Sequence, residues 1–235
     1  SGSLVLSERM SREPDAILVV GPSWVGDMVM AQSLFKALRR ASPEVAIDVL
    51  SPGWSLPLLA RMPEVRAGIA MPLGHGRLGL LARWRLGRSL RGRYQRAIVL
   101  PNSWKSAIVP FAAGIPLRTG WRGEMRYGLL NDIRVLDPQR HPMTVQRFVA
   151  LAQAANAPLP TIQPPLLAIK PDDVQAAADA LNAVKKPDRR VLALCPGAEY
   201  GPAKQWPTVH YAELGRRFAR AGWDLWLFGS SKDMA

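Results

Sequence analysis

A carboxylate stands where a predicted strand gives way to a helix near the start of the chain. The apolar run Ala16–Val20, closed by Gly21 and Pro22, predicts a buried strand, and from Asp27 onward apolar residues recur at helical spacing. In open α/β sheets, ligands bind outside the carboxyl ends of the strands, where a glycine such as Gly26 lets the backbone approach them. Asp27 is therefore predicted at the mouth of a cleft. The alternative, which spacing alone favours, is that Asp27 only caps the helix.

The spacing around Asp27 excludes two common phosphate-binding motifs. Gly21 and Gly26 match the glycines of a G-x-x-x-x-G loop, but Asp27 and Met28 stand where that loop needs Lys and Ser or Thr. No G-x-G-x-x-G pattern is present either, so a dinucleotide-binding interpretation has only the strand-turn-helix context in its favour.

A second polar group follows the strand predicted at 96–100. Asn102, Ser103 and Lys105 occupy the same kind of position as Asp27, so they are candidate substrate contacts at the same crevice. Turn formation and helix capping are the alternative that the sequence alone favours. The polar stretch from Arg122 to Tyr127 is predicted to be a loop that reaches over the cleft, which makes Arg122 another candidate contact.

A third candidate site lies between Pro196 and Pro207, after a predicted strand and before a helix. Its glycines allow close approach of the backbone, the helix N-terminus favours an anion, and Lys204 offers a mobile cation. Together these features suit a phosphate or diphosphate. The alternative is an ordinary solvated lysine on a surface loop.

The elements that must position these residues alternate between strands and helices. Strands are predicted at 16–20, 45–50, 65–71, 96–100 and 118–121, and helices from Asp27, at 54–61, within 77–96, at 104–111 and at 145–155. This alternation predicts an α/β fold, a parallel sheet with helices on both faces. The rhythm restarts with a strand at 166–169, a helix at 171–184, a strand at 191–195, a helix after Pro207 and a strand at 225–228.

A proline-rich stretch separates two predicted domains. Residues 157–165 contain four prolines, which favour extended backbone over sheet pairing, and we interpret them as an inter-domain linker. The prediction is a polar tail at 1–14, a Rossmann-like domain at 15–165 that ends in the linker, and the beginning of a second domain at 166–235. With about three strands, the second domain falls short of the usual domain size of roughly 100–150 residues and is expected to be incomplete.

Composition narrows the classes of function. The 235 residues are 48% hydrophobic and include one cysteine, Cys195, so we expect a substantial core without an internal disulfide, which fits the cytoplasm. No apolar window is long enough to cross a membrane. His75, His141 and His210 are scattered along the chain, so no metal site is predicted.

The formal net charge of +13 predicts attraction to nucleic acid, an anionic membrane surface or an acidic substrate. Positive charge is concentrated in an arginine-rich segment at 77–96, which has no acidic residue and is interleaved with leucines: Arg77, Arg83, Arg85, Arg88, Arg91, Arg93 and Arg96. This pattern is typical of a basic amphipathic helix at a membrane surface, or of an ordinary helix with one face packed on the sheet. Nucleic acid is not expected, because no reader motif or set of stacking aromatics accompanies the arginines.

Four segments together resemble one enzyme family. They are Trp24–Met28, Leu100–Ser106, Gly114–Trp121 and Cys195–Pro207, and the resemblance runs in order from about Ile17 to Phe228. The family is that of the ADP-heptose:lipopolysaccharide heptosyltransferases, glycosyltransferase family 9, and the Cys195–Pro207 block is more similar to its type II than to its type I members. The later segment with which this family holds its donor has no counterpart before Ala235, which again predicts an incomplete donor domain.

The resemblance implies the GT-B architecture, with one Rossmann-like domain for the acceptor and another for the sugar nucleotide. It implies transfer of L-glycero-D-manno-heptose from ADP-heptose to the inner-core heptose on lipid A, with inversion and with no cofactor. The protein would then be cytoplasmic and peripheral at the inner membrane. Asp27 would be the general base; Lys204, Gly197, Ala198 and Glu199 would bind the donor, and Gly26, Asn102, Ser103, Lys105 and Arg122 the acceptor.

The physical chemistry of an inverting transfer agrees with these roles. A carboxylate at a helix N-terminus stays ionised at neutral pH and can accept the acceptor's proton. The leaving ADP gains negative charge, which helix N–H groups and Lys204 would stabilise without a metal. The rival hypothesis is a non-catalytic basic Rossmann-like module that binds an anionic glycolipid or nucleic acid. A coding sequence that continues into a complete donor domain would favour the enzyme.

Overall fold

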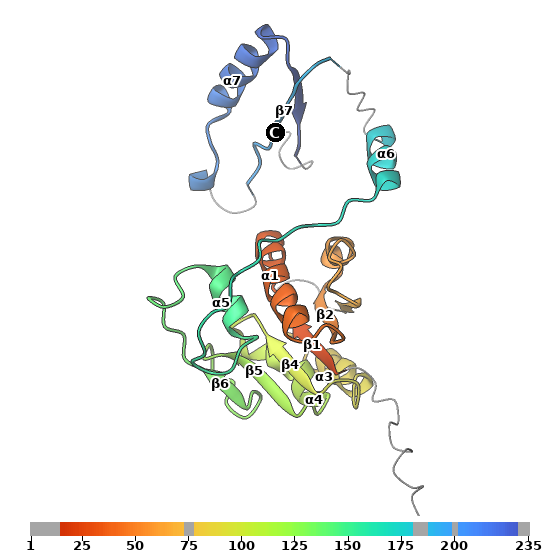
Figure 1. Ribbon diagram of the computed structural model, residues 1–235, viewed down its shortest axis with the longest axis vertical. Helices are drawn as coiled ribbons and strands as arrows, with labels where there is room; N and C mark the ends of the chain where they lie inside the picture. Colours follow the sequence, from red (N-terminus) through yellow and green to blue (C-terminus); the bar gives the residue numbers. More distant parts are fainter. Residues whose placement is uncertain (1–14, 73–77, 181–187, 199–201, 230–235) are drawn as a thin grey trace, which may run out of the picture. The chain divides into compact units, whose positions relative to one another are not determined.

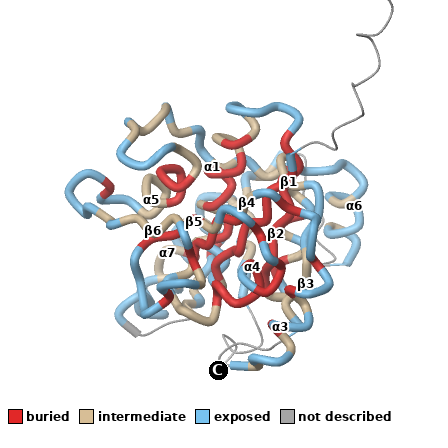
Figure 2. Tube along the Cα trace, turned by 90° about the horizontal axis from the view of Figure 1, so that it is seen from below, coloured by how far each residue is buried: buried red, intermediate tan, exposed pale blue. Residues whose placement is uncertain are grey.

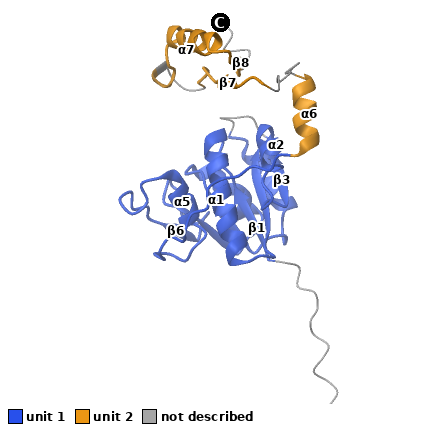
Figure 3. Cartoon of the chain, turned by 45° about the horizontal axis from the view of Figure 1, so that its top comes forward, with its two compact units in different colours: residues 1–169 blue, residues 170–235 orange. Residues whose placement is uncertain are grey.

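The computed structural model describes residues 15–72, 78–180, 188–198 and 202–229. The chain divides into two compact units, Ser1–Ile169 and Lys170–Ala235, which Figure 3 shows in different colours. The division follows the proline-rich stretch at 157–165 by a few residues. The tail predicted at 1–14 lies outside the described residues.

Parallel strands form a six-stranded sheet in the first unit, in the order β3-β2-β1-β4-β5-β6 (Figure 1). The strands are β1 Ala16–Val20, β2 Ala46–Pro52, β3 Ala67–Met71, β4 Arg96–Val99, β5 Leu117–Trp121 and β6 Asp132–Arg134. The predicted parallel α/β sheet is confirmed, and this strand order is that of Rossmann-like folds. β6 was not predicted, because two of its three residues are charged and show no hydrophobic alternation.

β1 is the central strand and is paired on both sides. Its Val20 lies opposite Leu50 of β2 and Val99 of β4. At its other end, the Ala16 N–H donates a 2.9 Å hydrogen bond to the Gln95 side chain, and the Gln95 N–H donates to the Ala16 carbonyl at 3.1 Å. The residue before β4 thus fixes the register between the two strands.

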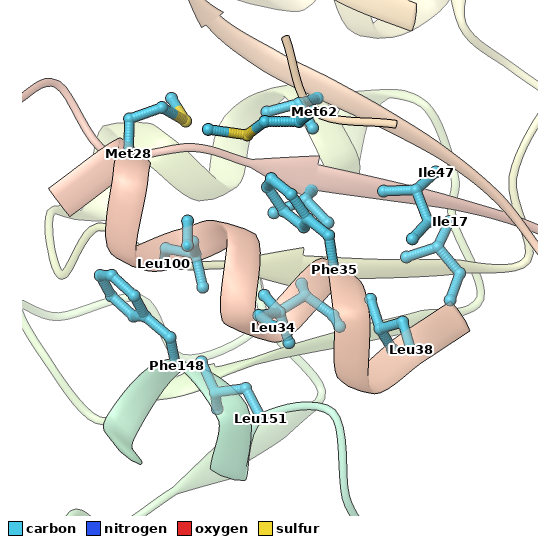
Figure 4. Packing of buried hydrophobic residues seen from close by; sticks show 14 of the residues in the cluster. Ile17, Met28, Leu34, Phe35, Leu38, Ile47, Met62, Leu100, Phe148 and Leu151 are labelled. Atoms are coloured by element: carbon cyan, nitrogen blue, oxygen red, sulfur yellow. The ribbon is translucent and has the colours of Figure 1, made fainter. Parts of the chain in front are cut away.

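Helices cover both faces of the sheet. They are α1 Val25–Ala41, α2 Leu56–Leu59, α3 Leu80–Ser89, α4 Ile108–Ala112 and α5 Thr144–Ala150. The hydrophobic cluster that contains α1 and α5 includes Ile17 and Val19 of β1, whereas Leu18 and Val20 belong to the cluster on the opposite face. Figure 2 shows the buried positions concentrated in the central strands, and Figure 4 shows Leu34 of α1 beside Leu151, the residue that follows α5. Within the described residues, no helix combines the length and apolar character needed to cross a membrane.

Several predicted helices are shorter or tighter than expected. The helix predicted at 54–61 is a 3₁₀ turn, Gly53–Ser55, followed by α2, and that predicted at 104–111 is a 3₁₀ helix, η2 (Trp104–Ala107), followed by α4. α5 ends at Ala150 rather than at Ala155. A 3₁₀ helix is common where a short connection leads from a strand into a helix.

A charged group is buried in the middle of β2. Asp48 accepts hydrogen bonds from Arg66 Nε at 2.9 Å and Nη2 at 2.7 Å, and from the Tyr94 hydroxyl at 2.6 Å. Burial raises the pKa of the Asp48 carboxyl, but the hydrogen bonds from Arg66 and Tyr94 and the nearby guanidinium charges outweigh it, so its pKa lies below the ordinary value. Burial and the hydrogen bond to Asp48 raise the pKa of Tyr94. This network ties β2 to the segment that leads into β4.

The strand predicted at 166–169 does not form. Instead the segment lies along α1, where the Gln32 side chain accepts a hydrogen bond from the Leu166 N–H and donates one to its carbonyl, both at 2.9 Å. Ser33 Oγ and Lys36 Nζ donate to the carbonyls of Gln163 and Pro164. Because side chains of α1 satisfy this backbone, the proline-rich stretch is held on the first unit without a strand partner.

In its described residues, the second unit contains a two-stranded parallel sheet and two α-helices. Its elements are α6 Pro171–Ala180, β7 Val191–Leu194, a 3₁₀ helix η3 Pro202–Lys204, α7 Thr208–Arg220 and β8 Asp224–Leu227, and β7 pairs with β8. α7 packs against both strands, with its buried Gly215 beside Leu225. This is the strand-loop-helix-strand order predicted for residues 191–228.

Candidate functional site

A cavity of about 510 Å³ opens at the carboxyl ends of β1, β2 and β4. The strand order reverses between β1 and β4, and such switch points are where Rossmann-like sheets bind ligands. Polar and charged side chains from five separate segments line it: Ser23, Asp27, Ser51, Arg83, Asn102, Ser103, Lys105, Ser106, Thr144 and Arg147. The structure thus brings together four residues that the sequence analysis predicted for one crevice.

Asp27 lines this cavity from the first turn of α1. The capping position is occupied by Trp24, in extended conformation, so the alternative that Asp27 is the helix cap is wrong. As the third helical residue, Asp27 still lies in the first turn of α1, at the end of the helix that attracts anions. Among the described residues, the structure gives its carboxylate no hydrogen bond or ion pair. The group is therefore available to a ligand.

The glycine near the turn before α1 that is crowded by its neighbours is Gly21 rather than Gly26. A β-carbon on Gly21 would lie 2.7 Å from the Met28 methyl carbon and 3.2 Å from Val49, because the chain passes directly over the core there. Gly26 lies inside α1, is exposed and has open space around its α-carbon. It does not line the cavity, so the expected close approach of backbone to ligand at Gly26 is not what the structure shows.

The loop after β4 supplies Asn102, Ser103 and Lys105 to the cavity. Ser103 occupies the capping position of η2 but its side chain makes no capping hydrogen bond, so the capping alternative for this residue is wrong. The loop is fixed from within by Ser106, whose hydroxyl donates to the carbonyls of Ser103 and Pro101. Cavity-facing side chains therefore project from a rigid turn.

Arg126 holds this loop in place through hydrogen bonds to Pro101 and Asn102, which the sequence did not predict. Its side chain is buried and donates to the carbonyl of Pro101 at 2.6 Å, to the carbonyl of Trp121, and to Asn102 Oδ1 at 3.4 Å. Burial lowers the pKa of its guanidinium. The stretch 122–127 was expected to reach over the cleft, but Arg126 instead lies beneath the loop, because its donors satisfy carbonyls that would otherwise be buried unpaired.

Glu124, which follows Gly123, joins the segment after β5 to the loop after β4. The Glu124 N–H donates to the Asn102 carbonyl at 3.0 Å, and its carboxylate accepts from the Trp104 N–H at 3.1 Å. The predicted acceptor contact Arg122 lies beside them but is exposed and does not line the cavity.

Cations outnumber carboxylates in the described lining of the cavity. Arg83, Lys105 and Arg147 contribute positive charge, against the single carboxylate of Asp27. Arg83 is buried, which lowers the pKa of its guanidinium, and its Nε donates to the Leu78 carbonyl at 2.8 Å. The arginine-rich segment was expected to present Arg83 on a surface, whereas α3 turns this residue inward. A cavity of this charge suits a ligand with anionic groups.

The residues predicted to bind the diphosphate belong to the second unit. Gly197 and Ala198 lie in the irregular segment after β7, and Lys204 ends η3 just before α7, exposed and without an ion pair among the described residues. Glu199 lies outside the described residues. No cluster of three His, Cys, Asp or Glu side chains suited to a metal occurs in the described parts of either unit.

Comparisons with known proteins agree on one family. The model of glycosyltransferase family 9 (heptosyltransferase) matches residues 83–235. The chain is 52% identical to lipopolysaccharide heptosyltransferase 2 of Escherichia coli K12 over 225 residues, covering 92% of this chain and 64% of that protein. It is 49% identical to lipooligosaccharide heptosyltransferase 2 of Haemophilus ducreyi, with the same coverage. The chain thus spans less than two thirds of the length of these curated relatives.

Solved structures give the same result. The structure of E. coli ADP-heptose LPS heptosyltransferase II aligns with a TM-score of 0.82 at 49% identity, over 93% of this chain and 65% of that one. E. coli heptosyltransferase WaaC with ADP aligns with a TM-score of 0.65 at 19% identity, over 92% of this chain and 68% of that one, which shows a shared fold.

Proposed function

The chain belongs to glycosyltransferase family 9, the heptosyltransferases, and from this membership we propose that it transfers L-glycero-D-manno-heptose from ADP-heptose to the inner-core heptose of lipopolysaccharide, with inversion at the anomeric carbon. The observation that carries the proposal is Asp27, a carboxylate without a partner among the described residues, in a cation-lined cavity at the switch point of the sheet. Family membership favours an enzyme over the rival non-catalytic module.

Asp27 acts as the general base in this proposal. In an inverting transfer, the attacking hydroxyl must lose its proton as its oxygen bonds to the anomeric carbon on the face opposite the leaving group. A carboxylate free of hydrogen bonds within the described protein can accept that proton, and the fixed first turn of α1 holds it in place. The proton moves from the acceptor hydroxyl to Asp27 while the glycosidic bond to ADP breaks.

The loop after β4 orients the acceptor. Asn102 and Ser103 offer hydrogen-bonding groups of the kind that bind sugar hydroxyls, and Lys105 offers a cation. With Arg83 and Arg147, Lys105 suits the anionic groups of a lipid-linked inner core. Gly26 and Arg122 lie outside the cavity lining, so we assign the acceptor to the other residues.

The turn between β7 and α7 binds the donor in this proposal. Lys204 pairs with the diphosphate, and Gly197, Ala198 and Glu199 provide backbone that the nucleotide sugar approaches. As the bond to the sugar breaks, the ammonium of Lys204 stabilises the charge that develops on ADP. We expect the reaction to need no metal or cofactor.

The lipid-linked acceptor sets the location. We place the protein in the cytoplasm, as a peripheral protein at the inner face of the inner membrane. The net charge of +13 supports this, because the cytoplasmic leaflet is anionic and attracts exposed arginines.

The test is a transfer assay with the full protein, ADP-heptose and a delipidated inner-core acceptor. We expect ADP release that depends on the acceptor, with a heptosylated product of inverted anomeric configuration by NMR. Tight binding of both substrates without any product would contradict the proposed activity.

A further inference from the structure

An exposed apolar surface lies where α3 and α4 meet, on the side of the sheet opposite α1. The described residues that line its open hollow of about 450 Å³ are all hydrophobic, among them Leu80, Leu81, Trp84, Trp104 and Phe111. Leu81 is 60% exposed and Trp84 43%, and the Trp84 and Phe111 rings lie 6.2 Å apart. We call this the α3–α4 apolar surface. A gathering of exposed aromatic and leucine side chains of this kind is typical of an interaction site.

Arginines border the α3–α4 apolar surface along the same helix. Leu81, Trp84, Arg85 and Arg88 follow the spacing of one helical face, with the apolar residues in the first half of α3 and the exposed arginines in the second. No acidic residue occurs anywhere from Leu78 to Arg96. The surface therefore combines apolar area with a helix that carries positive charge and no carboxylate of its own.

The same elements line the acceptor cavity. Along α3, Arg83 lines the cavity while its neighbour Trp84 lines the apolar surface, and along η2, Lys105 lines the cavity while Trp104 lines the apolar surface. A molecule bound at the α3–α4 apolar surface is therefore separated from the cavity only by the thickness of these two helices.

We propose that the α3–α4 apolar surface inserts into the headgroup region of an anionic bilayer, with Arg85 and Arg88 against lipid phosphates. Tryptophan and leucine beside arginine, without acidic residues, is the composition of segments that lie in a membrane interface. This assignment rests on the proposed function, because a lipid-linked acceptor bound in the adjacent cavity would bring the protein to the membrane. The sequence alone predicted a membrane contact through the arginines of 77–96. In the structure Arg83 and Arg96 point inward, and the exposed side chains of this region include Leu81 and Trp84.

The test is co-sedimentation of the full protein with vesicles of phosphatidylethanolamine and phosphatidylglycerol, compared with vesicles of phosphatidylcholine. Two double variants remove the two halves of the surface: Leu81→Ser with Trp84→Ser, and Arg85→Gln with Arg88→Gln. None of these side chains belongs to the hydrophobic clusters of the first unit, so the fold should persist. Matched controls change exposed residues elsewhere: Val135→Ser with Val174→Ser, and Arg40→Gln with Arg220→Gln.

We expect the apolar variant to lower the vesicle partition coefficient at least tenfold at every salt concentration. The arginine variant should lower it at least tenfold at low salt only, because attraction to anionic lipid is screened beyond about 8 Å at physiological ionic strength. Quenching of tryptophan fluorescence by brominated lipid should fall in the variant that lacks Trp84, and both control variants should bind like the wild type.

Three outcomes would overturn the proposal. The first is that the surface variants bind vesicles as well as the controls do. The second is that Trp84 is shielded from iodide in the full protein without vesicles. The third is that sedimentation shows a dimer that only the apolar variant dissociates. The last result would assign the surface to a second copy of the chain. Transfer to a delipidated acceptor should be unchanged in the surface variants, so loss of vesicle binding with normal transfer separates this proposal from the proposed activity.

Discussion

Gly123 and Asn102 pack so closely that a β-carbon at position 123 would lie 2.4 Å from the Asn102 carbonyl oxygen. No real contact is that short, and the neighbouring atom belongs to the backbone, which cannot rotate away as a side chain can. Gly123 therefore sets the position of the loop that carries Asn102, Ser103 and Lys105 into the cavity.

Gly123→Ala should displace this loop and impair transfer. We expect kcat/KM for the acceptor to fall roughly 10-fold to 100-fold, as misplacement of a substrate-positioning group by about 1 Å does in enzymes. The free energy of unfolding should fall by about 1–3 kcal/mol, measured by urea denaturation. Gly53→Ala is the matched control, since its β-carbon would meet open space. A normal kcat/KM in Gly123→Ala would show that the loop position does not matter for the acceptor.

Asp27→Asn should lower kcat by roughly 10² to 10⁴, because the amide cannot take the proton of the attacking hydroxyl. The KM for ADP-heptose should change little. Loss of the charge in the first turn of α1 costs only about 0.3–1 kcal/mol of helix stability, so thermal denaturation should confirm an intact fold. Steady-state ADP release measures the effect, and a kcat near that of the wild type would remove Asp27 from the mechanism.

Lys204→Ala should weaken donor binding, because the diphosphate loses its mobile cation. We expect KM for ADP-heptose to rise at least tenfold and kcat to fall as well, since the same charge stabilises the departing ADP. Lys170→Ala, at another exposed lysine of the second unit, is the control. Equal donor titrations for the two variants would contradict the role of Lys204.

The hydrogen bonds of Asp48 should make the free energy of unfolding depend on pH. Its folded pKa lies below the ordinary value of 3.8, so the unfolded state binds more protons in the interval between the two pKa values. The stabilisation is complete above pH 5 and is lost as pH falls through 3.8 toward the folded pKa. Asp48→Asn should lower the free energy of unfolding by about 1–3 kcal/mol at pH 7, a moderate cost because Arg66 remains partly hydrated.

Urea denaturation at pH 7 and at pH 3 measures this difference. The gap between wild type and Asp48→Asn should narrow at the lower pH, because protonation removes the wild type's advantage. A gap that is equal at both pH values would show that packing, rather than the charge of Asp48, stabilises β2.

Much of the site follows from local sequence, because it depends on where strands end. The apolar runs in the sequence predict β1 and β4. Polar residues in the segments that follow these strands, such as Asp27 and Asn102, then lie at the same edge of a parallel sheet. The same reasoning chose Gly26 over Gly21, since spacing does not reveal which α-carbon meets the core. Arg83 shows a similar limit: its inward direction depends on how α3 is rotated against the sheet.

Other features could not be predicted because they depend on contacts between distant segments. The burial of Arg126 requires the carbonyls of Pro101 and Trp121 to converge on it. The sequence predicted that a strand starts at Leu166. In the structure both the N–H and the carbonyl of Leu166 form hydrogen bonds with the Gln32 side chain. In each case a long polar side chain satisfies backbone groups of a segment that is distant in the sequence.

The double pairing of β1 has a consequence for synthesis on the ribosome. Ala16 and Gln95 join across 79 positions of the chain, so β1 emerges long before its β4 partner exists. At roughly 5–20 residues per second, the nascent chain carries an apolar strand that lacks its β4 partner for roughly 4 to 16 seconds. An unpaired strand edge is a template for aggregation, and this interval is when a ribosome-associated chaperone would protect it.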